Sequence, residues 1–150
     1  MVELRAEDPW ILLAVLYSNR SAGAASLVDL VAAADFINHA IPSLGELDGA
    51  LSRLRRHGWV TIEDLTFRPT AKAVSMLADR LRWRTSVHTD LQLVRDRLNA
   101  PMWGPAASLP RPPRRPRVAG LNQEALDKAT DSYRSSARRL TTRQSRPGQP

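Results

Sequence analysis

The chain has 150 residues, a formal net charge of +7 at pH 7 and no cysteine. The length fits one domain, or one domain with a tail. The lack of cysteine excludes disulfides, thiolate metal sites and a cysteine nucleophile. No secretory signal and no apolar run of membrane-spanning length is visible, so we expect a cytoplasmic protein without a membrane partner.

The excess of positive over negative charge lies entirely in the last third of the sequence. Residues 1–100 contain 12 basic and 12 acidic side chains, whereas residues 101–150 contain 10 basic and 3 acidic ones. The basic character therefore describes the C-terminal segment and not the part that we expect to fold into a body.

Two helices are predicted in the first third of the chain. Asp8 and Pro9 suit the N-cap and the first position of a helix. The apolar run over residues 10–17 predicts that this helix lies in the middle of a small core. Ser26 is the expected cap of a second helix, which ends before a turn over residues 36–42.

A third helix and a β-hairpin follow. Ser43 and Glu46 form a capping box, and Gly58 ends the helix after a basic last turn. Strand-forming residues follow, and the chain turns over residues 63–65 into a second strand. This strand ends at Pro69, because proline cannot continue the hydrogen-bond ladder of a sheet. The apolar stripe of the helix consists of Leu44, Leu47, Leu51 and Leu54.

The rest of the chain is predicted to hold helices separated by a linker. Thr70 caps one helix, and Val87–Leu98 is a further segment that either continues it or folds back. The proline-rich residues 101–120 predict an extended, polyproline-like linker. We expect a terminal amphipathic helix over residues 121–140 and a disordered tail over residues 141–150.

The order helix, helix, helix, hairpin, helix over residues 9–81 resembles the winged helix-turn-helix domain of MarR- and PadR-like transcriptional regulators. The resemblance covers about half the chain and implies a mainly α fold with a small β-hairpin, followed by C-terminal helices. Residues 1–100 would form this domain. The local pattern that carries the resemblance consists of Leu51, Leu54, Gly58, Val60, Phe67, Thr70 and Leu77.

The resemblance implies a DNA-binding regulator that acts as a dimer on double-stranded DNA. In that family the third helix enters the major groove and the wing tip reaches the adjacent backbone or minor groove. Carried over, residues 43–56 would be the recognition helix, residues 63–66 the wing tip and Val87–Leu98 the dimerisation helix. The residues expected to contact DNA are Ser52, Arg53, Arg55, Arg56, Arg68 and Lys72, with Arg111, Arg114, Arg115 and Arg117 of the linker adding non-specific affinity.

Acidic residues depart from the family pattern. Glu63 and Asp64 occupy the wing tip, where phosphates would repel them. Glu46 and Asp48 occupy the part of the third helix where base-reading residues are expected. The basic linker also fits a solvated spacer or a polyproline ligand.

The side of the third helix opposite the leucines has an unusually smooth composition. Gly45, Gly49 and Ser52 would let a groove or a partner helix approach the backbone closely, or they reflect drift on an exposed face. With the acidic wing, this favours an alternative function. The chain would then be a winged-helix protein–protein interaction module that does not bind DNA.

Catalytic and metal-binding patterns are absent from the sequence. His39, His57 and His88 are far apart and none has metal-ligand spacing. The chain has no glycine-rich phosphate loop, no nucleophile elbow and no metalloprotease motif. We therefore expect no enzyme activity, no cofactor and no metal.

Overall fold

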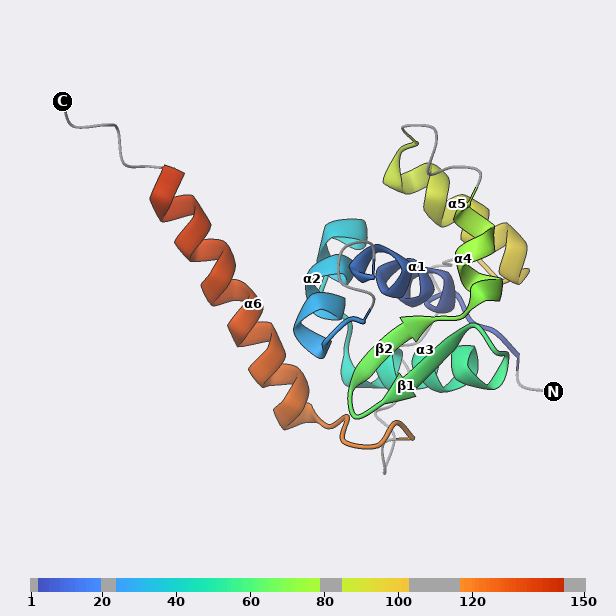
Figure 1. Ribbon diagram of the computed structural model, residues 1–150, viewed down its shortest axis with the longest axis horizontal. Coiled ribbons are helices and arrows are strands. Elements are labelled where there is room, and N and C mark those ends of the chain that lie inside the picture. The colour runs from blue at the N-terminus through green and yellow to red at the C-terminus, as the bar shows by residue number, and fades with distance from the viewer. Residues whose placement is uncertain (1–2, 20–23, 79–84, 103–116, 145–150) are drawn as a thin grey trace.

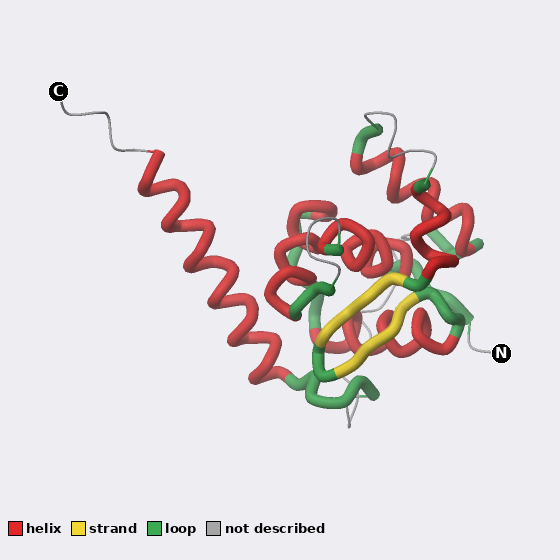
Figure 2. The backbone as a smooth tube through the Cα atoms, in the orientation of Figure 1, coloured by secondary structure: helices red, strands yellow, loops and turns green. Residues whose placement is uncertain are grey.

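The computed structural model describes residues 3–19, 24–78, 85–102 and 117–144. These residues form a mainly helical fold with one two-stranded antiparallel sheet, as the sequence predicts (Figures 1 and 2). The elements in chain order are α1 (Asp8–Ser18), α2 (Leu27–Asn38), α3 (Leu44–Arg56), β1 (Val60–Glu63), β2 (Thr66–Pro69), α4 (Ala71–Leu77), α5 (Val87–Leu98) and α6 (Gln123–Gln144).

Short polar side chains cap the helices that follow α1, and those of Ser26, Ser43 and Thr70 are at the predicted positions. Ser26 and Ser43 form capping boxes with the acidic residue three positions later, which satisfies backbone N–H groups that have no partner within the helix. Thr70, Ser86 and Asn122 each accept a backbone N–H from the first turn of their helix. The Ser86 cap starts α5 as a separate helix rather than as a continuation of α4.

The start of α1 departs from the prediction. Asp8 is the first helical residue and not the N-cap, and the residue at the cap position, Glu7, makes no side-chain capping bond. The Asp8 carboxylate instead accepts the backbone N–H of Arg5 at 2.8 Å and is fully buried. A buried carboxylate requires a cationic partner, and α3 supplies it.

The core is built around α1, which contacts α2, α3, α5 and β2. Every residue from Trp10 to Leu16 is buried, as the apolar run predicts. The Trp10 indole N–H donates to the carbonyl of Ala34 at 2.9 Å, so its polar atom is satisfied inside the core. Trp59, which also suits a core position, is only half-buried.

The hairpin has a two-residue turn and is tied to the α1–α2 connection. Asp64 and Leu65 form the turn, and both have positive φ angles, 47° and 54°, as a tight hairpin turn requires. Phe67 of β2 exchanges two backbone hydrogen bonds with Ala25, at 3.1 and 2.9 Å. The side chain of Phe67 is fully buried, which fixes the hairpin to the core.

The C-terminal helices pack on two sides of the body. α5 lies against α1, where the Tyr17 hydroxyl donates to Asp90 and where Val94 and Leu98 are buried within the chain. A homodimer through Val87–Leu98 is not tested by a single chain and stays a prediction. α6 packs along α2 and continues to Gln144 rather than ending at residue 140.

Candidate interaction surface on α3

The predicted recognition helix, α3, is covered on more sides than its sequence suggests. Leu47, Leu51 and Leu54 of the predicted stripe are fully buried in the core, and Leu44 is half-buried. The polar residues on the two flanks of this stripe are buried as well. Two different segments of the same chain cover them: the residues before α1 on one flank, and residues 117–121 on the other.

On the first flank, Arg53 forms a buried ion pair with the start of α1. Its Nε and Nη2 donate to the two carboxylate oxygens of Asp8 at 2.9 and 2.7 Å, and Nη2 also donates to Glu7 at 2.8 Å. Arg53 as a whole is 5% exposed. Burial alone would lower the pKa of the guanidinium, but the hydrogen bond to Asp8 and the charges of Asp8 and Glu7 outweigh it and raise that pKa.

This ion pair bears on the sequence interpretation of Arg53. Nε and Nη2 of Arg53 are used inside the chain and its charge is balanced there, so the structure does not present this side chain to a phosphate, and the DNA contact expected of it stays an untested prediction. Gly49 has a local role on the same flank: a Cβ at this position would lie 3.0 Å from Nη1 of Arg53. The glycine therefore leaves room for the folded-back arginine.

On the second flank, Asp48 holds the segment that precedes α6. One carboxylate oxygen of Asp48, Oδ1, accepts the backbone N–H groups of Arg117 and Val118, each at 2.8 Å. Asp48 is 1% exposed, and its second oxygen has no hydrogen-bond partner among the described residues. We call residues 117–121 the arm.

Two apolar side chains fasten the arm to the body. Val118 and Leu121 are both fully buried and belong to the hydrophobic core that is built around α1. The Leu121 N–H donates to the Val118 carbonyl at 3.1 Å, and Gly120 has a φ of 79°, which a β-turn with glycine at its third position requires. A Cβ on Gly120 would lie 3.6 Å from the side chain of Leu65 in the hairpin turn. The arm thus bridges α3 and the hairpin.

The surroundings of α3 bear on two further predictions. Ser52 is 1% exposed, so it offers little surface to a ligand, and the DNA contact expected of it stays an untested prediction. The linker predicted over residues 101–120 does not stay extended to its end, because residues 118–121 form a turn and pack on the body. Arg117 keeps an exposed side chain, while Arg111, Arg114 and Arg115 lie outside the described residues.

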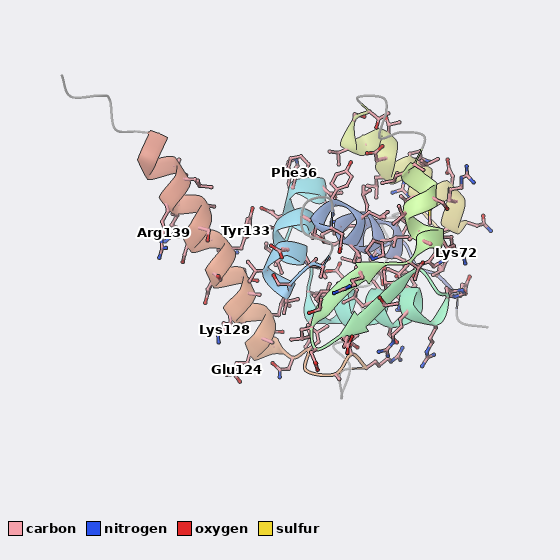
Figure 3. The ribbon with its side chains drawn as sticks, in the orientation of Figure 1. Phe36, Lys72, Glu124, Lys128, Tyr133 and Arg139 are labelled. Carbon is pink, nitrogen blue, oxygen red and sulfur yellow. The ribbon has the colours of Figure 1, made fainter. Side chains whose placement is uncertain are left out.

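The remaining predicted DNA contacts are exposed but lie away from the polar flanks of α3. Arg55 and Arg56 are at the C-terminal end of α3, and Arg68 is on β2. Lys72, labelled in Figure 3, lies 3.8 Å from the centre of the Trp59 ring and donates to the carbonyl of His57 at 3.2 Å. These contacts are a cation–π pair and a cation at a helix end, both of which are structural.

The arm is the part of this surface that the sequence interpretation missed. The usable signal was the pair Val118 and Leu121, two apolar residues three apart with Gly120 between them, directly after a run of proline and arginine. Asp48 gave a second signal, since an acidic residue at a DNA-reading position has to be explained by another partner.

No family model, curated protein or solved structure matches the chain. Among the described residues, no helix is long and apolar enough to cross a membrane. In the same part of the chain, no group of three His, Asp or Glu side chains could hold a metal ion.

Proposed function

We propose that the chain is a winged-helix protein–protein interaction module, in which the α3 face binds polypeptide rather than DNA. The α3 face is the side of α3 around Asp48 that the arm covers. The winged-helix assignment is supported by the order of α1, α2, α3, hairpin and α4, and by the tight α2–α3 turn. In that turn His39 has a φ of 53° and Ser43 caps the next helix. The edge pairing of Ala25 with Phe67 adds a third short stretch to the hairpin.

The observation that carries this proposal is the capture of the arm by α3. Asp48 provides a buried acceptor for two consecutive backbone N–H groups, and the neighbouring surface buries two apolar side chains three residues apart. A surface of this kind recognises a peptide turn that begins with two free amides. Hydrogen bonds to a charged acceptor contribute about 1.5–3 kcal/mol each.

The charges around α3 also support a polypeptide partner. Asp48 lies on the flank of α3 that the arm covers, and Glu63 and Asp64 are exposed at the hairpin turn. All three would be repelled by the phosphates of a DNA backbone. Arg53, the cation nearest the middle of the helix, is neutralised by Glu7 and Asp8.

The competing function is DNA binding through the exposed cations Arg55, Arg56, Arg68 and Lys72. These four side chains are exposed and could contact phosphates without the middle of α3. In this second function, DNA would have to displace the arm to reach the bases, because the arm and the groove would occupy the same side of the helix.

A peptide added in trans separates the two functions. The arm is opened in the full chain by Val118→Ser together with Leu121→Ser, and a labelled peptide of residues 115–123 is titrated into the opened and the wild-type chains. The opened chain should bind the peptide at least roughly tenfold more tightly, because the tethered arm no longer competes at a high effective concentration. Adding Asp48→Ala should abolish this gain.

The same chains are titrated with a random duplex of about 20 base pairs. The proposal predicts that opening the arm leaves DNA affinity unchanged within about twofold. The proposal fails if the opened chain does not bind the peptide but gains affinity for the duplex. In that case, replacing Arg55 and Arg56 with glutamine should remove the gain.

A further inference from the structure

The last helix projects beyond the body. Its first half packs along α2, where Leu126 and Ala129 are buried, and the Tyr133 hydroxyl donates to Asp35 at 2.7 Å. Figure 1 shows that α6 lies on the side of α2 opposite α1 and that its C-terminal half extends away from the other helices. Residues 134–141 are all exposed. We call residues 134–144 the distal half of α6.

Charge is separated along this helix. The first half carries Glu124, Asp127 and Asp131 against a single lysine, whereas the distal half carries four arginines and no acidic residue. No acidic residue follows Asp131 in the sequence. Cations at a helix C-terminus suit the helix dipole, but that effect acts within the last turn, and Arg134 lies more than two turns before the end.

We propose that the distal half of α6 binds the sugar–phosphate backbone of double-stranded DNA. This surface lies outside the α3 face and is independent of the polypeptide binding proposed for that face. Its ligand is the duplex backbone, which carries one charge per roughly 1.7 Å of helix axis and attracts arginine in a sequence-independent way.

The geometry of the helix fits a duplex groove. The distal half spans 11 residues, which corresponds to about 16 Å, and the helix is about 10–12 Å wide with its side chains. The major groove of B-DNA is about 12 Å wide and admits an α-helix. Arg134 and Arg138 lie one turn apart on the same side, and Arg139 lies about 140° around the axis from Arg134. Arginines on two sides of one helix can reach phosphates on both walls of a groove.

Figure 3 supports the orientation that this requires. Tyr133 points toward the body, whereas Lys128 and Arg139 point away from it. The contact between Tyr133 and Asp35 holds the helix against α2. Arg134 and Arg138 are exposed at the mouth of a pocket that they line together with Asp35 and Ile41, and Arg139 is exposed on the side away from the body.

An anionic membrane is a poorer partner for the same arginines. A helix that lies in a membrane surface needs a broad apolar face, usually with Trp, Phe or Leu. The distal half offers only Ala137 and Leu140, of which Leu140 is 66% exposed. The apolar area is therefore small, and the cationic side carries the interaction.

The test compares two triple variants of the full chain that lose the same charge. One replaces Arg134, Arg138 and Arg139 with glutamine, which keeps a high helix propensity. The matched control replaces Arg55, Arg56 and Arg68 of the body. Binding to a random duplex of about 20 base pairs is measured by fluorescence anisotropy at about 50 and 200 mM salt.

The α6 variant should lose about 2.7 units of the salt slope, which is about 0.9 for each lost phosphate contact. Between those two salt concentrations this slope corresponds to about a 40-fold change in affinity. The control should stay within about twofold of the wild type. Circular dichroism verifies that α6 is retained in the variant.

Four results would overturn the proposal. The first is a wild-type chain that does not bind the duplex, and the second is an equal loss in both triple variants. The third is no loss in the α6 variant but a loss in an additional variant that replaces Arg111, Arg114 and Arg115. The fourth is tighter arginine-dependent binding to vesicles of anionic lipid than to the duplex. The second result would mean that net charge alone attracts the DNA, and the third would transfer the site to the linker.

Discussion

Replacing Arg53 with methionine should destabilise the whole domain, although α3 would keep its helix propensity. The change leaves the fully buried carboxylate of Asp8 and the buried carboxylate of Glu7 without their cation. Removing one partner of a buried ion pair costs about 3–5 kcal/mol. That is a large part of the roughly 5–15 kcal/mol that stabilises a typical domain, and it should lower the melting temperature by about 6–20 °C.

The assay is equilibrium urea unfolding followed by circular dichroism at neutral pH. Arg55→Met is the matched control, because Arg55 is exposed on the same helix and its loss should change the unfolding free energy by no more than about 0.5 kcal/mol. Neutralising the acids as well, with Glu7→Gln and Asp8→Asn, should restore much of the loss. A cost below about 1 kcal/mol for the single variant would refute the ion pair as a stabilising element.

Three further changes test the packing around α3 and α6. Asp48→Ala should raise hydrogen exchange at the two arm amides by at least roughly tenfold, because they lose a charged acceptor. Gly49→Ala should fail to give the usual gain of about 1 kcal/mol in helix stability, yet give it in an Arg53→Met background. Tyr133→Phe should lower the unfolding free energy by about 1 kcal/mol at neutral pH. The bond to Asp35 raises the pKa of the Tyr133 hydroxyl, so this contribution is complete below the ordinary tyrosine value and disappears as pH rises through the raised pKa.

The local parts of the fold could be predicted because they depend on neighbouring residues. The Ser43–Glu46 box acts across three positions, and the same is true of the caps at Ser26, Thr70 and Ser86. The buried α1 follows from an apolar run with no polar side. In each case a few adjacent residues contain all the information that the structure uses.

The surroundings of α3 depend on contacts that are distant in sequence. An amphipathic pattern identifies the leucine stripe but does not tell which other segment covers the flanks. Arg53 meets Asp8 across 45 residues, and Asp48 meets Val118 across 70. The polar residues on the two flanks therefore suggested an exposed side that reads DNA. In the folded chain, Arg53 and Asp48 instead contact other segments of the same chain.

The most direct test of the account follows the arm while DNA is present. Hydrogen exchange of the Arg117 and Val118 amides, the two donors to Asp48, is measured in the full chain with and without a saturating random duplex. The account predicts that both amides keep their protection, because DNA binds α6 and the arm stays bound to α3. Loss of protection at these amides when the duplex binds would contradict it, since DNA would then have displaced the arm from the helix.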